Sequence, residues 1–238
     1  MNANLREFLD QAYVADEIFE LRPDYRALLI AVDGIEPGES NETSEAMLVD
    51  AENHANKLLE ETAVTELPHI ADWREAYKAF GAKPSRTRNS LEALTRRAAK
   101  GLPRVNRLTD IYNAISVKHQ IPLGGEDIDK YVGALHLVRA TGEEDFATFS
   151  AGEPEIEHPE VGEVIWRDDE SVTCRLWNWR QCARTGLTDQ TTTAVFILDA
   201  LGALSDEELQ AAGAELAERV KELGTNVTVE QRLIAHNV

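Results

Sequence analysis

The chain has 238 residues, a net charge of −19 and 43% apolar residues, enough for a sizeable core. It has no run of about 20 apolar residues that could span a membrane, and Met1 to Glu7 lacks the features of a secretory signal, so we expect a cytoplasmic protein without membrane contact. Two cysteines, Cys174 and Cys182, cannot form a disulfide framework and are expected to be packed free thiols. A reactive Cys182 beside Arg180 and Arg184 is the minor alternative.

Helices dominate the predicted first half. Leu5 to Phe19 has the spacing of one amphipathic helix, and Tyr25 to Val32 is an apolar run typical of a buried strand. Further helices are predicted over residues 42–61, 70–80, 90–100 and 110–119. The first of these is capped by Ser40 or Asn41, and the last by Thr109.

Strands dominate the predicted second half. The pair Gly124-Gly125 indicates a turn, a strand is predicted over residues 132–141, and residues 163–167 and 171–177 are predicted to form a hairpin. Residues 191–201 are rich in β-formers but could also be a helix. Ser205 caps a helix over residues 206–223, with Glu208 completing a capping box, and residues 225–234 could form a final strand.

Helices followed by strands predict an α+β fold, with a layered mixed sheet flanked by helices. We expect a helical N-terminal extension over residues 1–67 with one strand of its own, packed on a main domain over residues 68–238 that ends in the last helix and strand.

Two clusters stand out from this acidic background. A basic segment, which we call the basic island, extends from Lys83 to Arg107 and contains eight basic residues against one acid, Glu92. It is either a solvated helix face or a functional patch. The segment Arg175 to Gln181, the Trp-Arg cluster, combines two tryptophans and two arginines with Asn178 and Gln181. Such groups suit a polar, partly planar ligand, although one buried and one exposed tryptophan on a strand is the simpler interpretation.

Common catalytic motifs are absent. The chain has no phosphate-binding or dinucleotide-binding glycine pattern and no Gly-x-Ser-x-Gly elbow. Its six histidines show no metal-ligand spacing, so we expect no cofactor and no metal.

Three blocks in order resemble a known family. These blocks are Arg104 to Asn113, Ile121 to Asp127 and Arg139 to Glu144, within a resemblance that covers residues 86–201. They resemble the B3/B4 domain, the tRNA-editing domain of the phenylalanyl-tRNA synthetase beta subunit. The matching positions are Arg107, Leu108, Asp110, Asn113, Pro122, Leu123, Asp127, Gly142 and Glu143. The family pattern has a histidine where this chain has Gly124, which indicates a larger pocket and a different acyl group.

The resemblance implies a free-standing editing hydrolase, which uses a positioned water to release an amino acid from a misacylated tRNA. No catalytic side chain is assigned. The partners would be the aminoacylated 3′ end of a tRNA and its amino-acid moiety. We expect the substrate to contact Asn113, Glu143, Arg175, Trp177, Asn178, Trp179, Arg180, Gln181 and Thr185. We expect the tRNA to contact Arg86, Arg88, Arg96, Arg97, Arg104 and Arg107.

Two other functions stay open. The pocket could belong to a non-catalytic module that binds or senses an amino acid or a related small molecule, which the net charge of −19 favours. The chain could also be an interaction domain without any ligand.

Overall fold

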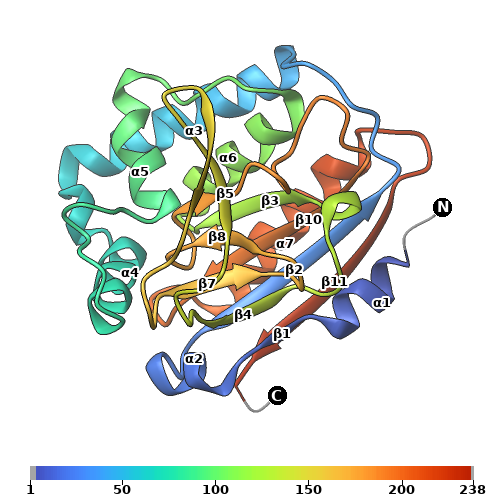
Figure 1. Cartoon of the computed structure of the whole chain (residues 1–238). Helices are drawn as coiled ribbons and strands as arrows, with labels where there is room; N and C mark the ends of the chain where they lie inside the picture. The colour runs from blue at the N-terminus through green and yellow to red at the C-terminus, as the bar shows by residue number, and fades with distance from the viewer. Residues whose placement is uncertain (1–3, 237–238) are drawn as a thin grey trace.

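The computed structural model describes residues 4–236 and arranges them in layers around two sheets (Figure 1). The α-helices are α1 (Leu5–Gln11), α2 (Asp16–Leu21), α3 (Glu42–Glu61), α4 (Pro68–Ala79), α5 (Ser90–Arg97), α6 (Arg107–Lys118) and α7 (Asp206–Lys221). The strands are β1 (Tyr13–Val14), β2 (Arg26–Asp33), β3 (Leu123–Asp127), β4 (His136–Arg139), β5 (Phe146–Ser150), β6 (Glu153–Glu157), β7 (Val164–Arg167), β8 (Val172–Arg175), β9 (Arg180–Gln181), β10 (Thr193–Ala200) and β11 (Thr228–Ala235).

The central sheet has four antiparallel strands in the order β11-β2-β10-β3. In its register, Val195 of β10 lies opposite Ala31 on one side and Glu126 on the other. Leu28 and Ile30 of β2 pack with α6 and α7, whereas Leu29 faces the second sheet. Because both faces are covered, β2 and β10 are apolar at nearly every position.

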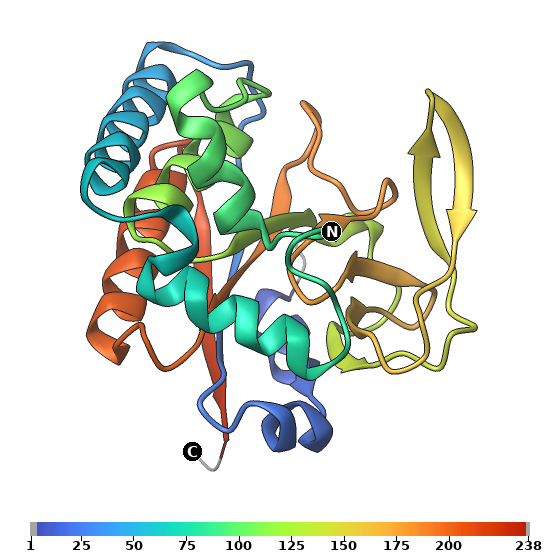
Figure 2. The same cartoon turned by 90° about the vertical axis from the view of Figure 1, so that its left-hand side faces the viewer.

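The second sheet has the order β1-β4-β7-β8-β9 and lies across the first, on the side away from α3, α6 and α7 (Figure 2). Side chains from its inner face, among them Leu137, Trp166 and Cys174, share a core with β2 and β10. A separate hairpin of β5 and β6 stands beyond this sheet (Figure 2).

The structure confirms the predicted α+β fold and most of the predicted elements. Asn41 caps α3, and Ser205 with Glu208 forms the capping box of α7, as expected. The hairpin of β7 and β8 is present, and so is the final strand β11. Residues 193–200 form a strand, which settles the alternative left open for that run.

Four local predictions were wrong. The first helix is interrupted at Ala12, because Tyr13 and Val14 pair with β4 and form β1. Helix α6 begins three residues before the predicted start and is capped by Asn106 instead of Thr109. The strand expected over residues 132–141 spans only the four residues of β4.

The fourth error concerns Gly124 and Gly125, which lie inside β3 rather than in a turn. A Cβ on Gly125 would lie 2.8 Å from side-chain atoms of Leu187 and Phe196, so the side chains packed against this position favour glycine there. The hairpin of β5 and β6 was not predicted.

Residues 1–67 contribute β2, which lies in the middle of the central sheet between β10 and β11. The segment therefore shares a sheet with the rest of the chain, and the division at residue 67 stays a prediction. Within residues 4–236, no helix is both long and apolar enough to cross a bilayer.

Candidate functional site

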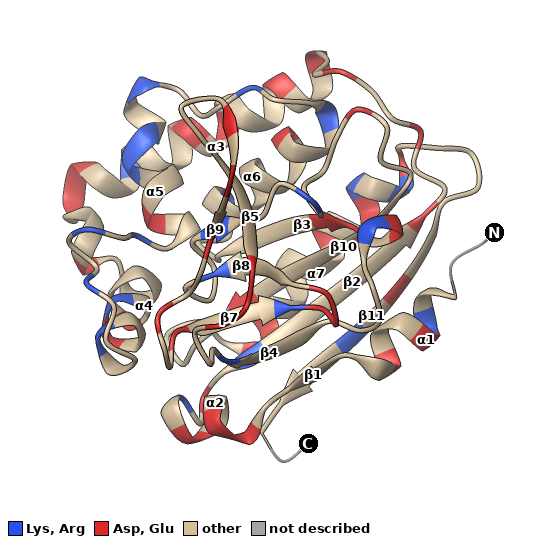
Figure 3. Ribbon diagram, viewed as in Figure 1, with Lys and Arg blue, Asp and Glu red and all other residues tan. Residues whose placement is uncertain are grey.

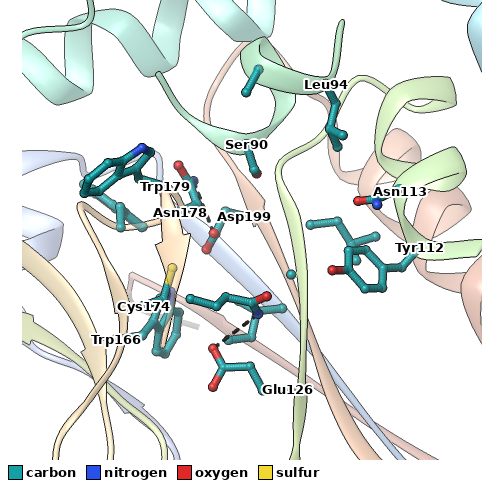
Figure 4. A pocket seen from close by; sticks show the side chains of 16 residues that line it. Ser90, Leu94, Tyr112, Asn113, Glu126, Trp166, Cys174, Asn178, Trp179 and Asp199 are labelled. Carbon is teal, nitrogen blue, oxygen red and sulfur yellow. Dashed lines mark hydrogen bonds between the residues drawn. The ribbon is translucent and has the colours of Figure 1, made fainter. Parts of the chain in front are cut away.

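A cavity of about 240 Å³ opens between the two sheets, below α5 and beside α6 (Figure 4). Its floor comes from β3 and β10, one wall from α6, and the opposite wall from β7, β8 and the turn after β8. The lining residues are Ser90, Ala93, Leu94, Tyr112, Asn113, Leu123, Gly124, Glu126, Trp166, Cys174, Trp177, Asn178, Trp179, Gln181, Ile197 and Asp199.

Helix α5 covers the cavity and is tied to the opposite wall. Asn89 caps the helix by accepting a hydrogen bond from the Glu92 backbone N–H at 2.8 Å. The backbone N–H of Ser90 donates to the backbone carbonyl of Asn178 at 2.9 Å. Ser90 and Leu94 therefore point toward the cavity from above (Figure 4).

The turn between β8 and β9 has two successive left-handed residues, Leu176 (φ 48°) and Trp177 (φ 68°). This conformation is unfavourable for side chains of this size and is found mostly where surrounding contacts impose it. Glu163 contributes such a contact by accepting a hydrogen bond from the Leu176 backbone N–H. The turn buries Trp177 against Tyr25 and brings Asn178 to the cavity.

Four buried polar side chains form a continuous network at one side of the cavity. Tyr77 Oη donates to Asn178 Oδ1 at 3.0 Å, and Asn178 Nδ2 donates to Asp199 Oδ2 at 3.2 Å. Tyr25 Oη donates to Asp199 Oδ1 at 2.6 Å. Burial raises the pKa of Asp199 to about 7, although both hydrogen bonds oppose this shift.

Glu126 is a second carboxyl group in the lining and is fully buried. Thr185 Oγ1 donates to its Oε2 at 2.9 Å, and the Tyr131 hydroxyl donates to the same oxygen. Gln181 Nε2 approaches Oε1 at 3.4 Å and donates to the Gly125 carbonyl at 2.9 Å. Burial raises the pKa of Glu126 against these donors.

Several lining groups bear on the chemistry of a ligand. Trp166 Nε1 and Ser90 Oγ are buried donors without a hydrogen-bond partner among residues 4–236. Cys174 in the lining and Cys182 outside it are free and buried, and burial raises the pKa of both thiols. A thiol held in its protonated form is a poor nucleophile, so the packed interpretation of both cysteines applies.

Five predicted substrate contacts line the cavity: Asn113, Trp177, Asn178, Trp179 and Gln181. They come from α6, from the turn after β8 and from β9, and long-range folding brings them together. Their role as contacts to a substrate stays a prediction.

The other four predicted contacts lie outside the lining. Arg175 binds Glu163 and Glu157, and Arg180 also binds Glu157 at 2.6 Å. Both guanidinium groups lie over the ring of Trp179, with Arg180 at 4.6 Å from its centroid. Thr185 supports Glu126, whereas Glu143 is exposed on the loop between β4 and β5.

The basic island divides into two parts (Figure 3). Arg86, Arg88, Arg96 and Arg97 lie on α5 and on the loop before it, and all four are exposed. Arg104 instead binds Glu45 and Glu52 of α3, and Arg107 donates to the Glu36 carbonyl. Only the first part lies on or next to α5, the helix that covers the cavity.

Glu92, the single acid of the basic island, is fully buried in α5. Arg74 and Arg96 each approach it at 2.9 Å, and Arg88 lies at 3.8 Å. This carboxylate therefore holds two arginines of the basic island, Arg88 and Arg96.

No cluster of three or more His, Cys, Asp or Glu side chains within residues 4–236 could hold a metal ion. The sequence interpretation missed Glu126, Asp199, Trp166 and Tyr112. A signal existed for Asp199, which is the single charged residue in the apolar run of β10.

Comparison with known proteins gives one family. Residues 72–208 match the model of the B3/4 domain. The match includes the blocks between Arg104 and Glu144 and confirms the predicted resemblance. No curated protein matches the sequence.

Among solved structures, the chain is similar to an N-terminal fragment of the phenylalanyl-tRNA synthetase beta subunit from Pyrococcus horikoshii. The two are 12% identical, with a TM-score of 0.46. The similarity covers 93% of this chain and 53% of the fragment, so the chain spans about half of that length.

Proposed function

The chain belongs to the B3/4 domain family, and on that premise we propose that it is a trans-acting editing hydrolase. It removes an amino acid from a misacylated tRNA with a positioned water as nucleophile. Membership relates the chain to the tRNA synthetases, because phenylalanyl-tRNA synthetase carries this domain in its beta subunit.

The composition of the cavity lining carries the proposal. It contains two carboxyl groups, Glu126 and Asp199, but no Lys, Arg or His. A free amino acid brings a carboxylate, which needs a cation or several donors when it leaves water. In an aminoacyl ester that carboxylate is replaced by an uncharged carbonyl, while the ammonium group remains. The lining therefore supports an ester substrate over a free amino acid.

The size of the cavity supports the same substrate. Its volume of about 240 Å³ is smaller than that of most pockets for drug-sized ligands, which hold roughly 300–1,000 Å³. An aminoacyl group fits such a space, whereas the terminal adenosine stays outside. The half-buried ring of Trp179 at the wall offers a stacking surface for a base.

Hydrolysis requires that a water attack the acyl carbonyl and that the ester bond to the ribose oxygen break. Ser90 Oγ–H is an unpaired donor on the helix that covers the cavity and is suited to bind the carbonyl oxygen as negative charge develops on it. The products are the free amino acid and a tRNA with its terminal hydroxyl restored.

Arg86, Arg88, Arg96 and Arg97 are proposed to contact the tRNA backbone. They are exposed on α5 and on the loop before it, beside the entrance to the cavity. A local basic patch offsets the net charge of −19 at the place where the acceptor end would approach.

The test is a deacylation assay against tRNAs that carry every standard amino acid, correctly or wrongly attached. We expect the purified protein to release amino acid from at least one mischarged tRNA. If the entire panel keeps its amino acids, the proposal is wrong.

The alternative is a non-catalytic binding module for an amino acid or related small molecule. The net charge of −19 favours it, because it weakens the affinity for tRNA. Salt separates the two: phosphate contacts make tRNA affinity fall steeply with salt, whereas binding of a zwitterion in the cavity changes little. The cavity beside Trp177 and Asn178 argues against a domain without any ligand.

A further inference from the structure

Asp199 differs in what holds it from every buried acid of residues 4–236 except Glu126. It is 2% exposed and lines the cavity from β10 (Figure 4). Other buried acids are paired with arginine, as Glu92, Glu163 and Asp168 are, or accept a backbone N–H, as Asp127 does. Among residues 4–236, Asp199 receives neither a cation nor a backbone N–H on its carboxyl group.

The carboxyl group retains acceptor capacity on the cavity side. A carboxylate has about four lone-pair sites, and Tyr25 and Asn178 occupy two of them. A water in the cavity can therefore donate to Asp199. Tyr77 donates a hydrogen bond to Asn178 Oδ1, which fixes the orientation of the Asn178 amide within the network.

A buried carboxyl group without a cation destabilises a fold near neutral pH, so the packing of the core does not explain why an aspartate occupies position 199. Groups of this kind concentrate at reactive sites, where their proton affinity suits the reaction. For Asp199, burial places the pKa at about 7, which is the range that suits a general base at neutral pH.

We propose that Asp199 is the general base of the hydrolysis, an inference that rests on the proposed function. Its carboxylate accepts a proton from the attacking water as the water oxygen bonds to the acyl carbon. When the bond between that carbon and the ribose oxygen breaks, the proton passes from Asp199 to the leaving oxygen. The carboxylate is thereby restored and no further reactant is needed.

Glu126 is the other candidate in the cavity and is less suited to this role. Thr185 and Tyr131 both donate to one of its oxygens, and Gln181 approaches the other. Three side chains thus hold Glu126 in place, which suits a group that contacts the acyl chain or its ammonium.

Several titratable groups face Asp199 from the surrounding elements. Burial raises the pKa of Tyr25, Tyr77 and Cys174 well above their ordinary values. His69, which binds the Leu201 backbone N–H, has its pKa lowered to about 4 by burial. None of these four changes charge near pH 7; Glu126, whose pKa is raised by burial, is the other carboxyl group in the lining.

The experiment is single-turnover deacylation of a tRNA that the wild type hydrolyses, between pH 5.5 and 8, with the enzyme-free rate subtracted. The wild-type rate should rise with pH and level off above about 7. Asp199→Asn should lower the rate about 100-fold or more and abolish this rise. Asp33→Asn is the matched control, because Asp33 lies at the far end of β2 and binds Thr193.

A second variant keeps the test decisive if Asp199→Asn does not fold. Tyr25→Phe removes a hydrogen bond that lowers the pKa of Asp199, so the midpoint of the pH profile should move upward. An Asp199→Asn enzyme with wild-type rate and profile, or an unmoved midpoint in Tyr25→Phe, would overturn the role of Asp199. A wild type that hydrolyses no tRNA would instead refute the proposed function itself.

Discussion

Replacing Asp199 by asparagine should change how the stability of the fold depends on pH. Burial raises the pKa of Asp199 from its ordinary value of 3.8 to about 7 in the folded protein. The folded protein therefore holds this proton more tightly than the unfolded chain does. The stabilisation from protonation is complete below about pH 4 and is lost as the pH rises through about 7.

The magnitude follows from that difference of about three pKa units. At 1.36 kcal/mol per unit, the full effect is about 4 kcal/mol. About 2 to 3 kcal/mol of it falls between pH 5 and pH 8, because part of the loss occurs below pH 5. Asparagine cannot titrate, so the stability of the variant lacks this pH-dependent contribution.

The assay is urea unfolding of the wild type and Asp199→Asn at several pH values from 5 to 8. The free energy of unfolding of the wild type, relative to the variant, should fall by about 2 to 3 kcal/mol across this range. Titration of all other groups cancels in the difference, and Asp33→Asn should follow the wild type. A difference that stays constant with pH would refute the account of Asp199 as a buried, uncompensated carboxyl group.

Three further substitutions test the surroundings of the cavity. Glu92→Gln should lower the free energy of unfolding by about 2 kcal/mol, because its arginine partners lose a buried carboxylate. Glu75→Gln removes only an exposed ion pair and should have little effect. Equal effects of the two substitutions in urea titrations would contradict this expectation. Arg86→Ala should weaken tRNA binding and reduce the slope of log affinity against log salt concentration by about 1. Arg104→Ala should change neither, because Arg104 is held by Glu45 and Glu52 of α3. Binding titrations at several salt concentrations measure both variants, and a larger effect of Arg104→Ala than of Arg86→Ala would rule out the proposed contact. Arg180→Ala should lower kcat/KM for deacylation about fivefold, because Trp179 loses a cation–π contact. An unchanged kcat/KM would mean that the position of Trp179 does not depend on Arg180.

Helices with local start signals were predicted from the sequence almost to the residue. The starts of α3 and α7 depend on capping hydrogen bonds within three residues of Asn41 and Ser205. Such interactions need no information from the rest of the chain. The apolar run of β2 was equally clear, because both of its faces are buried.

The errors occurred where distant segments decide the local conformation. Tyr13 leaves its helix in order to pair with His136, more than 100 residues later. The glycine pair at 124 and 125 has the composition of a turn, but its strand conformation depends on Phe196 of β10. Composition alone does not contain these contacts.

The candidate site was predicted in part for the same reason. The unusual composition of the Trp-Arg cluster indicated a ligand wall, and four of its members line the cavity: Trp177, Asn178, Trp179 and Gln181. The acidic partners of Arg175 were not predictable, because Glu157 lies in a hairpin that the sequence did not reveal. Glu126 and Asp199 are brought to the same cavity only when β3 pairs with β10.

The most direct test of the account fills the entrance of the cavity. Ala93 is exposed on α5 and lines the cavity, so Ala93→Trp should block it with little cost to the fold. Ala99→Trp is the matched control, because Ala99 is exposed in the following turn, outside the lining. In the deacylation assay, Ala93→Trp should lose about tenfold or more of the rate, whereas Ala99→Trp should keep it. Equal rates for the two variants would contradict the claim that this cavity performs the reaction.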